Sequence, residues 1–297
     1  MKCDLCPRKC LVDRKKGEKG ICGQTENLKV ARAALHFWEE PCISGDAGSG
    51  AVFFSGCPLH CVFCQNENIA NGTVGKEIAL ERLVDIFLEL QEKRANNINL
   101  VTPGHFVPQI VKALDQARRE GLTLPVVYNT SSYETVDTIK MLEGYVDIYL
   151  PDFKYMSPVL SKKYSHAPDY AEVAKAAIAE MVRQTGKAVF VNGDEDNLIL
   201  SGTIVRHLTL PGCMADSMQI LKYLHDTYGD MIYISIMNQF TPLSNLEKYP
   251  ELNRRITDVE YETLVDYAIE IGIENGFIQE GDTAEESFIP AFDCEGV

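Results

Sequence analysis

Long apolar runs are missing from this sequence: no stretch reaches the roughly 18 consecutive apolar residues that a membrane-spanning helix requires. The first residues also lack the apolar stretch of a secretory signal peptide, so we expect a cytoplasmic protein with no membrane partner. Positive charge is scarce, since 28 Lys and Arg stand against 43 Asp and Glu and give a formal net charge of −15. Nucleic-acid binding depends on basic patches, and we therefore expect no nucleic-acid partner.

Cysteine, in contrast, is abundant, with ten in 297 residues. Most of them fall in two tight groups: Cys3, Cys6, Cys10 and Cys22, then Cys57, Cys61 and Cys64. In a cytoplasmic chain of this length, such groups indicate metal binding rather than a disulfide scaffold.

Strand-like and helical patterns alternate along the chain and predict an α/β fold. Apolar runs typical of strands cover residues 51–55, 98–102, 125–129, 146–150, 203–209 and 231–236, and helical periodicity covers 77–94, 107–120, 134–143, 170–184 and 215–228. Six β-then-α units in series predict parallel strands with right-handed crossovers. Because a closed TIM barrel has eight such units, we expect a partial (β/α)6 TIM-like barrel, with a doubly wound sheet as the alternative.

The predicted organisation has three parts. Residues 1–45 form a small Cys-rich metal-binding segment with little strand or helical periodicity, residues 46–245 form the barrel, and residues 246–297 form a last helix and an acidic tail. Asn192-Gly193 predicts a hairpin turn ahead of the fifth strand.

Cys57, Cys61 and Cys64 share one short loop directly after the first barrel strand, where barrel enzymes carry their active sites. Three thiolates can bind three irons of a [4Fe–4S] cluster and leave the fourth iron open to another ligand. An open coordination position distinguishes a catalytic metal centre from a structural one. The alternative is a zinc knuckle that takes a fourth ligand from His60 or Cys42.

Cys57-x3-Cys61-x2-Cys64, with an aromatic residue before the last cysteine, resembles the signature of radical S-adenosylmethionine (SAM) enzymes. The resemblance implies a [4Fe–4S] cluster on the three cysteines and SAM bound at the open iron. It implies an oxidoreductase in which the reduced cluster cleaves SAM to methionine and a 5′-deoxyadenosyl radical, which abstracts hydrogen from the substrate. By the same resemblance, Phe63 packs near the adenine.

Residues at the ends of later strands extend this resemblance. Thr102 stands where the family has an acidic residue for the SAM amino group, so Thr102 or backbone carbonyls are expected to replace it. Asn129 is expected to face the ribose, and Asp152 to give a supporting polar contact. Lys154 and Arg206 are expected to hold the SAM carboxylate, as in glycyl-radical-enzyme activases. Alternatively, Asp152 and Lys154 form a surface ion pair. Arg206 lies in an apolar run where an unpaired charge is costly, and a ligand carboxylate is a suitable counter-ion.

Motifs outside the cysteine loop resemble the pyruvate formate-lyase-activating-enzyme-like (PflX-type) branch: Glu40-Pro41-Cys42-Ile43-Ser44-Gly45, Val101-Thr102-Pro103, Arg206-His207-Leu208 and Phe288-Ile289-Pro290-Ala291-Phe292-Asp293. This branch implies a protein substrate in which hydrogen abstraction installs a glycyl radical, and an electron donor such as flavodoxin or ferredoxin. A small molecule or peptide is the alternative substrate of the same radical. The alternative from another class is a non-catalytic Fe–S electron carrier or a zinc-stapled binding module, which would not bind SAM.

Cys3-x2-Cys6-x3-Cys10-x11-Cys22 supplies four thiolates, enough for a closed structural zinc site or for an auxiliary Fe–S cluster. Zinc is slightly favoured, because a short segment with little core needs a metal to hold it together. The pyruvate formate-lyase activase itself lacks such a segment, which separates this chain from it.

Overall fold

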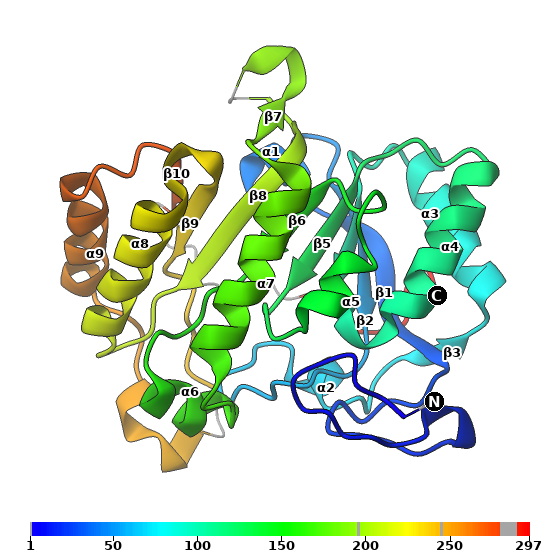
Figure 1. Ribbon diagram of the computed structural model, residues 1–297, viewed down its shortest axis with the longest axis horizontal. Coiled ribbons are helices and arrows are strands. Elements are labelled where there is room, and N and C mark those ends of the chain that lie inside the picture. Colours follow the sequence, from blue (N-terminus) through cyan, green and yellow to red (C-terminus); the bar gives the residue numbers. More distant parts are fainter. Residues whose placement is uncertain (1, 195–196, 244–245, 280–289) are drawn as a thin grey trace.

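The centre of the protein is an open, largely parallel β-sheet (Figure 1). The computed structural model describes residues 2–194, 197–243, 246–279 and 290–297. In sheet order, the parallel strands are β2 (Ser49–Phe54), β4 (Ile98–Val101), β5 (Val126–Thr130), β6 (Ile148–Pro151), β8 (Ile199–Leu208), β9 (Tyr233–Met237) and β10 (Gly276–Ile278). The antiparallel strands β1 (Leu28–His36) and β3 (Lys76–Ile78) extend the sheet beyond β2. β10 and β3 are its two edges, so the barrel is partial.

Helices cover the outer face of this sheet. The longer ones are α3 (Leu80–Glu92), α4 (Val107–Arg119), α5 (Val136–Lys140), α6 (Pro158–Ser165), α7 (Tyr170–Thr185), α8 (Met214–Tyr228) and α9 (Asp258–Glu270). In Figure 1, α3 and α4 stand at one end of the sheet and α8 and α9 at the other. The short helices are α1 (Pro41–Ser44) and α2 (Glu67–Ala70), and 3-10 turns lie at Arg14–Lys16, Gly104–Phe106, Val191–Gly193, Gly229–Met231, Leu246–Lys248 and Pro250–Leu252.

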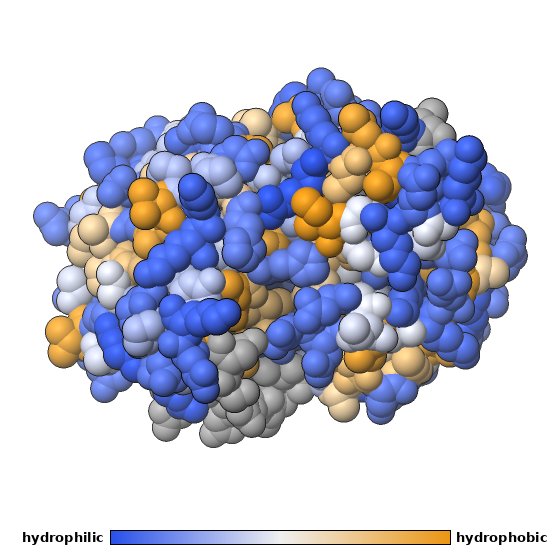
Figure 2. Space-filling view, turned by 90° about the horizontal axis from the view of Figure 1, so that it is seen from below, coloured by the Kyte–Doolittle hydropathy of each residue, from blue (hydrophilic) through white to orange (hydrophobic). Residues whose placement is uncertain are grey.

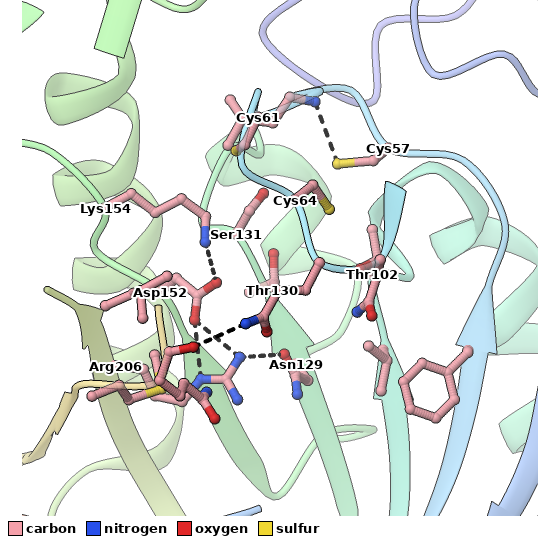
Figure 3. A pocket seen from close by; sticks show the side chains of 18 of the residues that line it. Cys57, Cys61, Cys64, Thr102, Asn129, Thr130, Ser131, Asp152, Lys154 and Arg206 are labelled. Atoms are coloured by element: carbon pink, nitrogen blue, oxygen red, sulfur yellow. Dashed lines mark hydrogen bonds and ion pairs between the residues drawn. The ribbon is translucent and has the colours of Figure 1, made fainter. Parts of the chain in front are cut away.

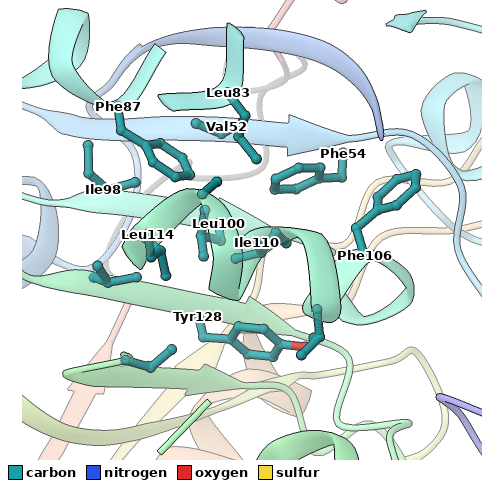
Figure 4. Close-up of a cluster of buried hydrophobic side chains, with 14 of the residues drawn as sticks. Val52, Phe54, Leu83, Phe87, Ile98, Leu100, Phe106, Ile110, Leu114 and Tyr128 are labelled. Atoms are coloured by element: carbon teal, nitrogen blue, oxygen red, sulfur yellow. The ribbon is translucent and has the colours of Figure 1, made fainter. Parts of the chain in front are cut away.

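The core between the sheet and the helices α3 and α4 follows from the periodicity of the sequence. Leu83, Phe87 and Leu90 recur at the spacing of one helix face, and all three are buried. They belong to one hydrophobic cluster with Val52 of β2 and Leu100 of β4 (Figure 4). β2, β4 and β5 are buried along their whole length, as expected for parallel strands covered on both faces. This packing gives the strand ends, where the site lies, a rigid base.

The six predicted barrel strands are present as β2, β4, β5, β6, β8 and β9, and the partial barrel is confirmed. The predicted hairpin is confirmed where it is described, because β7 (Val189–Phe190) pairs antiparallel with the first half of β8. Residues 195–196 of that hairpin lie outside the described residues, as do Phe288 and Ile289 of the branch motif. Within the described part of the chain, no helix has the length and apolar character needed to cross a bilayer.

The strand β1 differs from the expectation for residues 1–45, where little strand periodicity was predicted. Lys29 and Arg32 interrupt its apolar pattern, and its burial does not alternate regularly. Its neighbours determine its conformation instead: β2 pairs along one edge, and the Ala33 N–H donates to the Glu295 carbonyl near the C-terminus. Tertiary context therefore outweighs local propensity here.

Candidate active site

A cavity of about 240 Å³ opens at the edge of the sheet where the parallel strands end. The cysteine loop, defined as residues 57–64, lies across this cavity from polar side chains at the ends of β4, β5, β6 and β8 (Figure 3). Figure 2 views the molecule from this side, where hydrophilic residues predominate and hydrophobic ones form separate patches. The carboxyl ends of the strands are where α/β barrels carry their active sites.

Glycine is required at the point where the chain leaves β2 for the cysteine loop. Gly56 has a φ of +91°, and a Cβ there would lie 2.5 Å from the carbonyl oxygen of Cys22. The turn brings Cys57, Cys61 and Cys64 together, and all three line the cavity. The predicted grouping of these thiols on one loop is therefore present in the structure.

Burial disfavours the thiolate form of all three cysteines, so we expect metal binding rather than solvent to remove their protons. Burial raises the pKa of Cys57 to about 11 and also raises the pKa of Cys61 and of Cys64. The Lys154 ammonium acts in the opposite direction on all three, and the Ser165 hydroxyl lies 3.0 Å from Cys61 Sγ. Metal ligation removes the proton from such thiols, so their charge is coupled to metal binding.

Four charged side chains of alternating sign form a row on the opposite wall: Lys154, Asp152, Arg206 and Glu39. Lys154 Nζ lies 2.6 Å from Asp152 Oδ2, and Arg206 Nε lies 3.0 Å from Asp152 Oδ1. Arg206 Nη1 then lies 3.0 Å from Glu39 Oε2. The Asp152 and Lys154 side chains are only 14% and 16% exposed, so they form a buried pair and not a surface one.

Arg206 finds its counter-ions within the chain. The sequence favoured a ligand carboxylate for this role, but Asp152 and Glu39 both bind the guanidinium, and Asn129 Oδ1 accepts from Nη2 at 2.7 Å. Lys154 carries three N–H donors, and its described hydrogen bond goes to Asp152. Of the two cations, Lys154 is therefore the better placed to hold a ligand carboxylate.

Glu39 is a site residue that the sequence analysis missed. Its Oε1 accepts hydrogen bonds from the amides of Asn99 at 3.0 Å and Asn129 at 3.1 Å, while Oε2 binds the arginine. Glu39 follows β1, a strand that the sequence analysis did not predict. Nothing in the sequence therefore indicated that this carboxylate lies beside the ends of the parallel strands. The available signal was the pair Glu39-Glu40 ahead of Pro41.

Asp152 and Lys154 both favour their charged forms although they are buried. Burial alone would raise the pKa of Asp152, but Lys154 and Arg206 outweigh burial and hold that pKa below its usual value. Burial disfavours the charge of Lys154, yet the Asp152 carboxylate outweighs it and the pKa lies above its usual value. Burial raises the pKa of the neighbouring Glu40, and Arg206 offsets this only in part. The four charges of the row sum to zero, which limits the cost of burying them.

Phe63 lines the cavity from the cysteine loop and is itself 5% exposed. Its ring centre lies 5.9 Å from that of Phe240 and within 6.5 Å of Tyr155 and Tyr164, all in edge contacts. An aromatic ring fixed on three sides gives the cavity a rigid apolar wall.

The ends of β4 and β5 supply further polar groups. Thr102 lines the cavity with a φ of +57°, a strained conformation for a β-branched residue, and its N–H donates to the Asn129 carbonyl at 2.9 Å. Behind the adjacent Thr130 lies Glu134, which the sequence analysis did not single out. Its carboxyl accepts from the Thr130 hydroxyl at 2.7 Å and from Tyr128 Oη at 2.9 Å, and burial raises its pKa to about 7.

The two alternative zinc ligands lie elsewhere. His60 Nε2 is 2.7 Å from the Ile21 carbonyl oxygen, which belongs to the N-terminal segment. Cys42 is buried in a separate hydrophobic cluster. The four N-terminal cysteines lie together around a second cavity of about 20 Å³.

Comparisons with known proteins agree with this geometry. Residues 51–197 match the family model of the radical SAM superfamily. The uncharacterized protein MJ0674 of Methanocaldococcus jannaschii is 27% identical over 275 residues, which are 90% of this chain and 74% of that protein. SuiB of Streptococcus suis bound to S-adenosylmethionine matches with a TM-score of 0.52 at 12% identity, over 76% of this chain and 48% of SuiB. HydG, a maturase of the [FeFe]-hydrogenase, matches with a TM-score of 0.51 at 15% identity, over 78% of this chain and 52% of HydG.

The chain therefore belongs to the radical SAM superfamily, and its fold is the partial barrel of that superfamily. It spans about half the length of the SuiB and HydG chains that it matches. Membership implies an enzyme that binds SAM and a [4Fe–4S] cluster, and the residues fit both groups. Among the described residues, no three His, Cys, Asp or Glu side chains are close enough to hold a single metal ion. Cys57, Cys61 and Cys64 line one cavity, so three thiolates of one loop are available to a [4Fe–4S] cluster.

Proposed function

We propose that this enzyme uses the radical derived from SAM to abstract hydrogen from a protein and install a glycyl radical, as a pyruvate formate-lyase-activating-enzyme-like (PflX-type) protein. One observation carries the SAM chemistry: three half-buried cysteines of one loop face Lys154 across a cavity at the strand ends. When bound, the reduced cluster supplies the electron that splits SAM into methionine and the hydrogen-abstracting radical. A ferredoxin- or flavodoxin-type protein is the proposed source of that electron.

The residues of the chain bind and orient in this proposal. Lys154 donates to the SAM carboxylate, and Asp152 and Arg206 hold the lysine in place. Phe63 forms the apolar wall for the adenine. Asn129 uses its oxygen on Arg206 and its nitrogen on Glu39, so it positions the charged row, and the neighbouring Ser131 is assigned to the ribose.

The open edge of the partial barrel is an argument for a large substrate. A third cavity, of about 240 Å³, adjoins the first, shares Glu39 and Arg206 with it, and is lined by the β10 residues at the sheet edge. Trp38 lines both cavities and is 61% exposed. Exposed aromatic residues at a cavity entrance are typical of protein-binding surfaces. A narrow, closed entrance would instead have favoured a small molecule.

The SAM chemistry is tested by anaerobic reconstitution with iron and sulfide, reduction with dithionite, and measurement of 5′-deoxyadenosine from added SAM. We expect 5′-deoxyadenosine from the wild-type protein, none from Cys61→Ala, and wild-type amounts from Cys294→Ala, which changes a cysteine outside both groups. Equal product from the wild-type and Cys61→Ala proteins would contradict the assignment of the cysteine loop.

The substrate class is tested separately, with pyruvate formate-lyase as the protein probe and electron paramagnetic resonance as the readout. We expect a glycyl-radical doublet that requires SAM, reductant and intact Cys61. Stimulation of 5′-deoxyadenosine formation by a low-molecular-mass extract, without any glycyl signal on the protein, would favour a small molecule or peptide and reject the glycyl-radical proposal.

A further inference from the structure

A short segment, residues 152–157, carries Lys154 beyond the end of β6 and is bonded by side chains of three other elements. From β8, His207 Nδ1 lies 2.8 Å from a carbonyl oxygen of the segment. From α8, the Asp216 carboxylate accepts from the N–H groups of the last two residues of the segment at 3.0 Å and 2.7 Å. From α7, Tyr170 Oη accepts from the Lys154 N–H at 3.0 Å. The backbone that carries Lys154 is therefore held from three directions.

Tyr170 differs from the other two side chains because its hydroxyl also reaches a second strand end. Its Oη lies 2.9 Å from the carbonyl oxygen of Ser131, which follows β5, and 2.8 Å from that of Asp152, which follows β6. The single hydroxyl proton serves these two carbonyls, while the oxygen accepts from Lys154. Ser131 and Lys154 both line the SAM cavity (Figure 3). One hydroxyl therefore joins the positions that are assigned to the SAM ribose and to the SAM carboxylate.

The packing of the Tyr170 ring fixes the position of this hydroxyl. Tyr170 is the first residue of α7 and is fully buried. Its ring centre lies 6.2 Å from that of Tyr133 in a stacked contact and 5.4 Å from that of Tyr155 in an edge contact. Burial raises the pKa of Tyr170 well above its usual value, so the hydroxyl keeps its proton and can donate.

Tyr170 and Asp216 act on the site only through the segment that they hold. Neither is among the described residues that line the SAM cavity. Asp152 holds Lys154 Nζ at 2.6 Å, but both residues belong to the same segment and move with its backbone. A binding geometry must be held to within about half an ångström to be productive, and backbone contacts from neighbouring elements provide that rigidity.

We propose that Tyr170, with support from Asp216, is a positioning residue for SAM. Its hydroxyl sets the position of Lys154 relative to Ser131, and thereby the spacing between the carboxylate and ribose subsites. The inference rests on the proposed function, in which Lys154 binds the carboxylate and Ser131 the ribose. The sequence did not single out Tyr170, because its hydroxyl bonds only to backbone groups, which lie 16 to 39 residues away.

The test compares the binding of SAM with that of decarboxylated SAM, which lacks only the carboxylate. Both are titrated into reconstituted holoproteins by isothermal titration calorimetry, without oxygen and without reductant, so that no SAM is cleaved. We expect the wild type to bind SAM more tightly. In Tyr170→Phe we expect the Kd for SAM to rise about tenfold, as for the loss of one hydrogen bond. Decarboxylated SAM does not span both subsites, so its Kd should stay within about twofold of the wild-type value.

Tyr149→Phe is the matched control. It also removes a fully buried hydroxyl next to the sheet, one that lies 2.6 Å from Gln184 Oε1 and away from the SAM cavity. We expect this variant to keep the wild-type preference for SAM. An equal loss of affinity for both ligands in Tyr170→Phe would reveal a general structural role and overturn the proposal, and so would no loss for either ligand.

Lys154→Ala separates this inference from the proposed function. If Lys154→Ala keeps the wild-type preference for SAM, the assignment of Lys154 to the carboxylate is wrong, and the positioning role of Tyr170 is wrong with it. If Lys154→Ala loses that preference while Tyr170→Phe keeps it, the assignment of Lys154 stands and only the role of Tyr170 is overturned.

Asp216→Asn keeps the proposal testable if Tyr170→Phe does not fold. The amide retains one acceptor oxygen, so one of the two backbone N–H groups loses its partner. We expect the Kd for SAM to rise roughly threefold and that for decarboxylated SAM to stay the same. Iron content and far-UV circular dichroism verify the fold of each variant before titration. An unchanged preference for SAM in folded Asp216→Asn protein overturns the proposal.

Discussion

The buried carboxyl of Glu134 makes the stability of the fold depend on pH in a calculable way. Burial raises the pKa of Glu134 from 4.5 to about 7, so between these values the folded state binds more protons than the unfolded state. Stability contributed by this group is therefore present at low pH and lost as pH rises. One pKa unit corresponds to about 1.4 kcal/mol, and the full effect is about 3 kcal/mol.

The substitution Glu134→Gln isolates this effect. The amide is neutral at every pH, and its oxygen can still accept from one of the two hydroxyls, of Tyr128 and Thr130, that donate to the carboxyl. From the two pKa values, we expect the variant to gain about 2.5 kcal/mol over the wild type between pH 5 and pH 8.

Anaerobic urea unfolding of both holoproteins, followed by far-UV circular dichroism, measures this difference directly. The effects of pH on the metal sites occur in both proteins and cancel in the comparison. If the unfolding free energies of the two proteins change in parallel across this pH range, Glu134 does not ionise within the folded protein, and the assignment is refuted. The control Glu81→Gln, at an exposed position in the first turn of α3, is expected to follow the wild type.

Two further substitutions test contacts that hold the site together. Glu39→Ala leaves Arg206 with one carboxylate, and we expect a loss of about 3 kcal/mol of unfolding free energy, measured in urea, whereas Asp226→Ala in an exposed ion pair changes nothing measurable. Arg8→Ala removes three hydrogen bonds to backbone carbonyls, and we expect a loss of about 2 kcal/mol together with faster release of iron to a chelator. Lys16→Ala, at an exposed position of the same segment, is the control, and equal rates of iron release in all three proteins would rule out the role of Arg8.

The barrel and the cysteine loop were predictable because their signals are local. Parallel strands covered on both faces appear as short apolar runs, and β2, β4 and β5 follow this rule along their whole length. Cys57, Cys61 and Cys64 are close in sequence, so their meeting at one cavity requires only a turn, which Gly56 provides. The strand-end positions Asp152, Lys154 and Arg206 were likewise found, because strand ends converge at one edge of a parallel sheet.

The partners of these residues were not predictable, because they depend on contacts between distant parts of the chain. Glu39 and Arg206 are 167 residues apart and meet only because the antiparallel β1 places residue 39 beside the strand ends. The counter-ion of Arg206 was therefore sought in a ligand, although the chain supplies it. The hydrogen-bond partners of Glu134 are only four and six residues away, but its carboxyl also lies against Gly104 of the 3-10 turn after β4, and a sequence pattern does not specify that packing.

The cysteine loop is held from outside by the N-terminal segment, and this links the two groups of cysteines. Arg8, two residues after Cys6, donates to the Pro58 carbonyl at 2.9 Å, and His60 meets the carbonyl of Ile21, the neighbour of Cys22.

Both contacts are made by residues within two positions of Cys6 and Cys22, so the order of the N-terminal segment determines whether they can form. Arg8 also donates to the carbonyl of Ser165, whose hydroxyl lies 3.0 Å from Cys61 Sγ. The N-terminal segment therefore supports the geometry of the cysteine loop through Arg8. Loss of these Arg8 contacts should first loosen residues 57–64, so SAM cleavage by Arg8→Ala should fall together with the iron content of that variant and not independently of it.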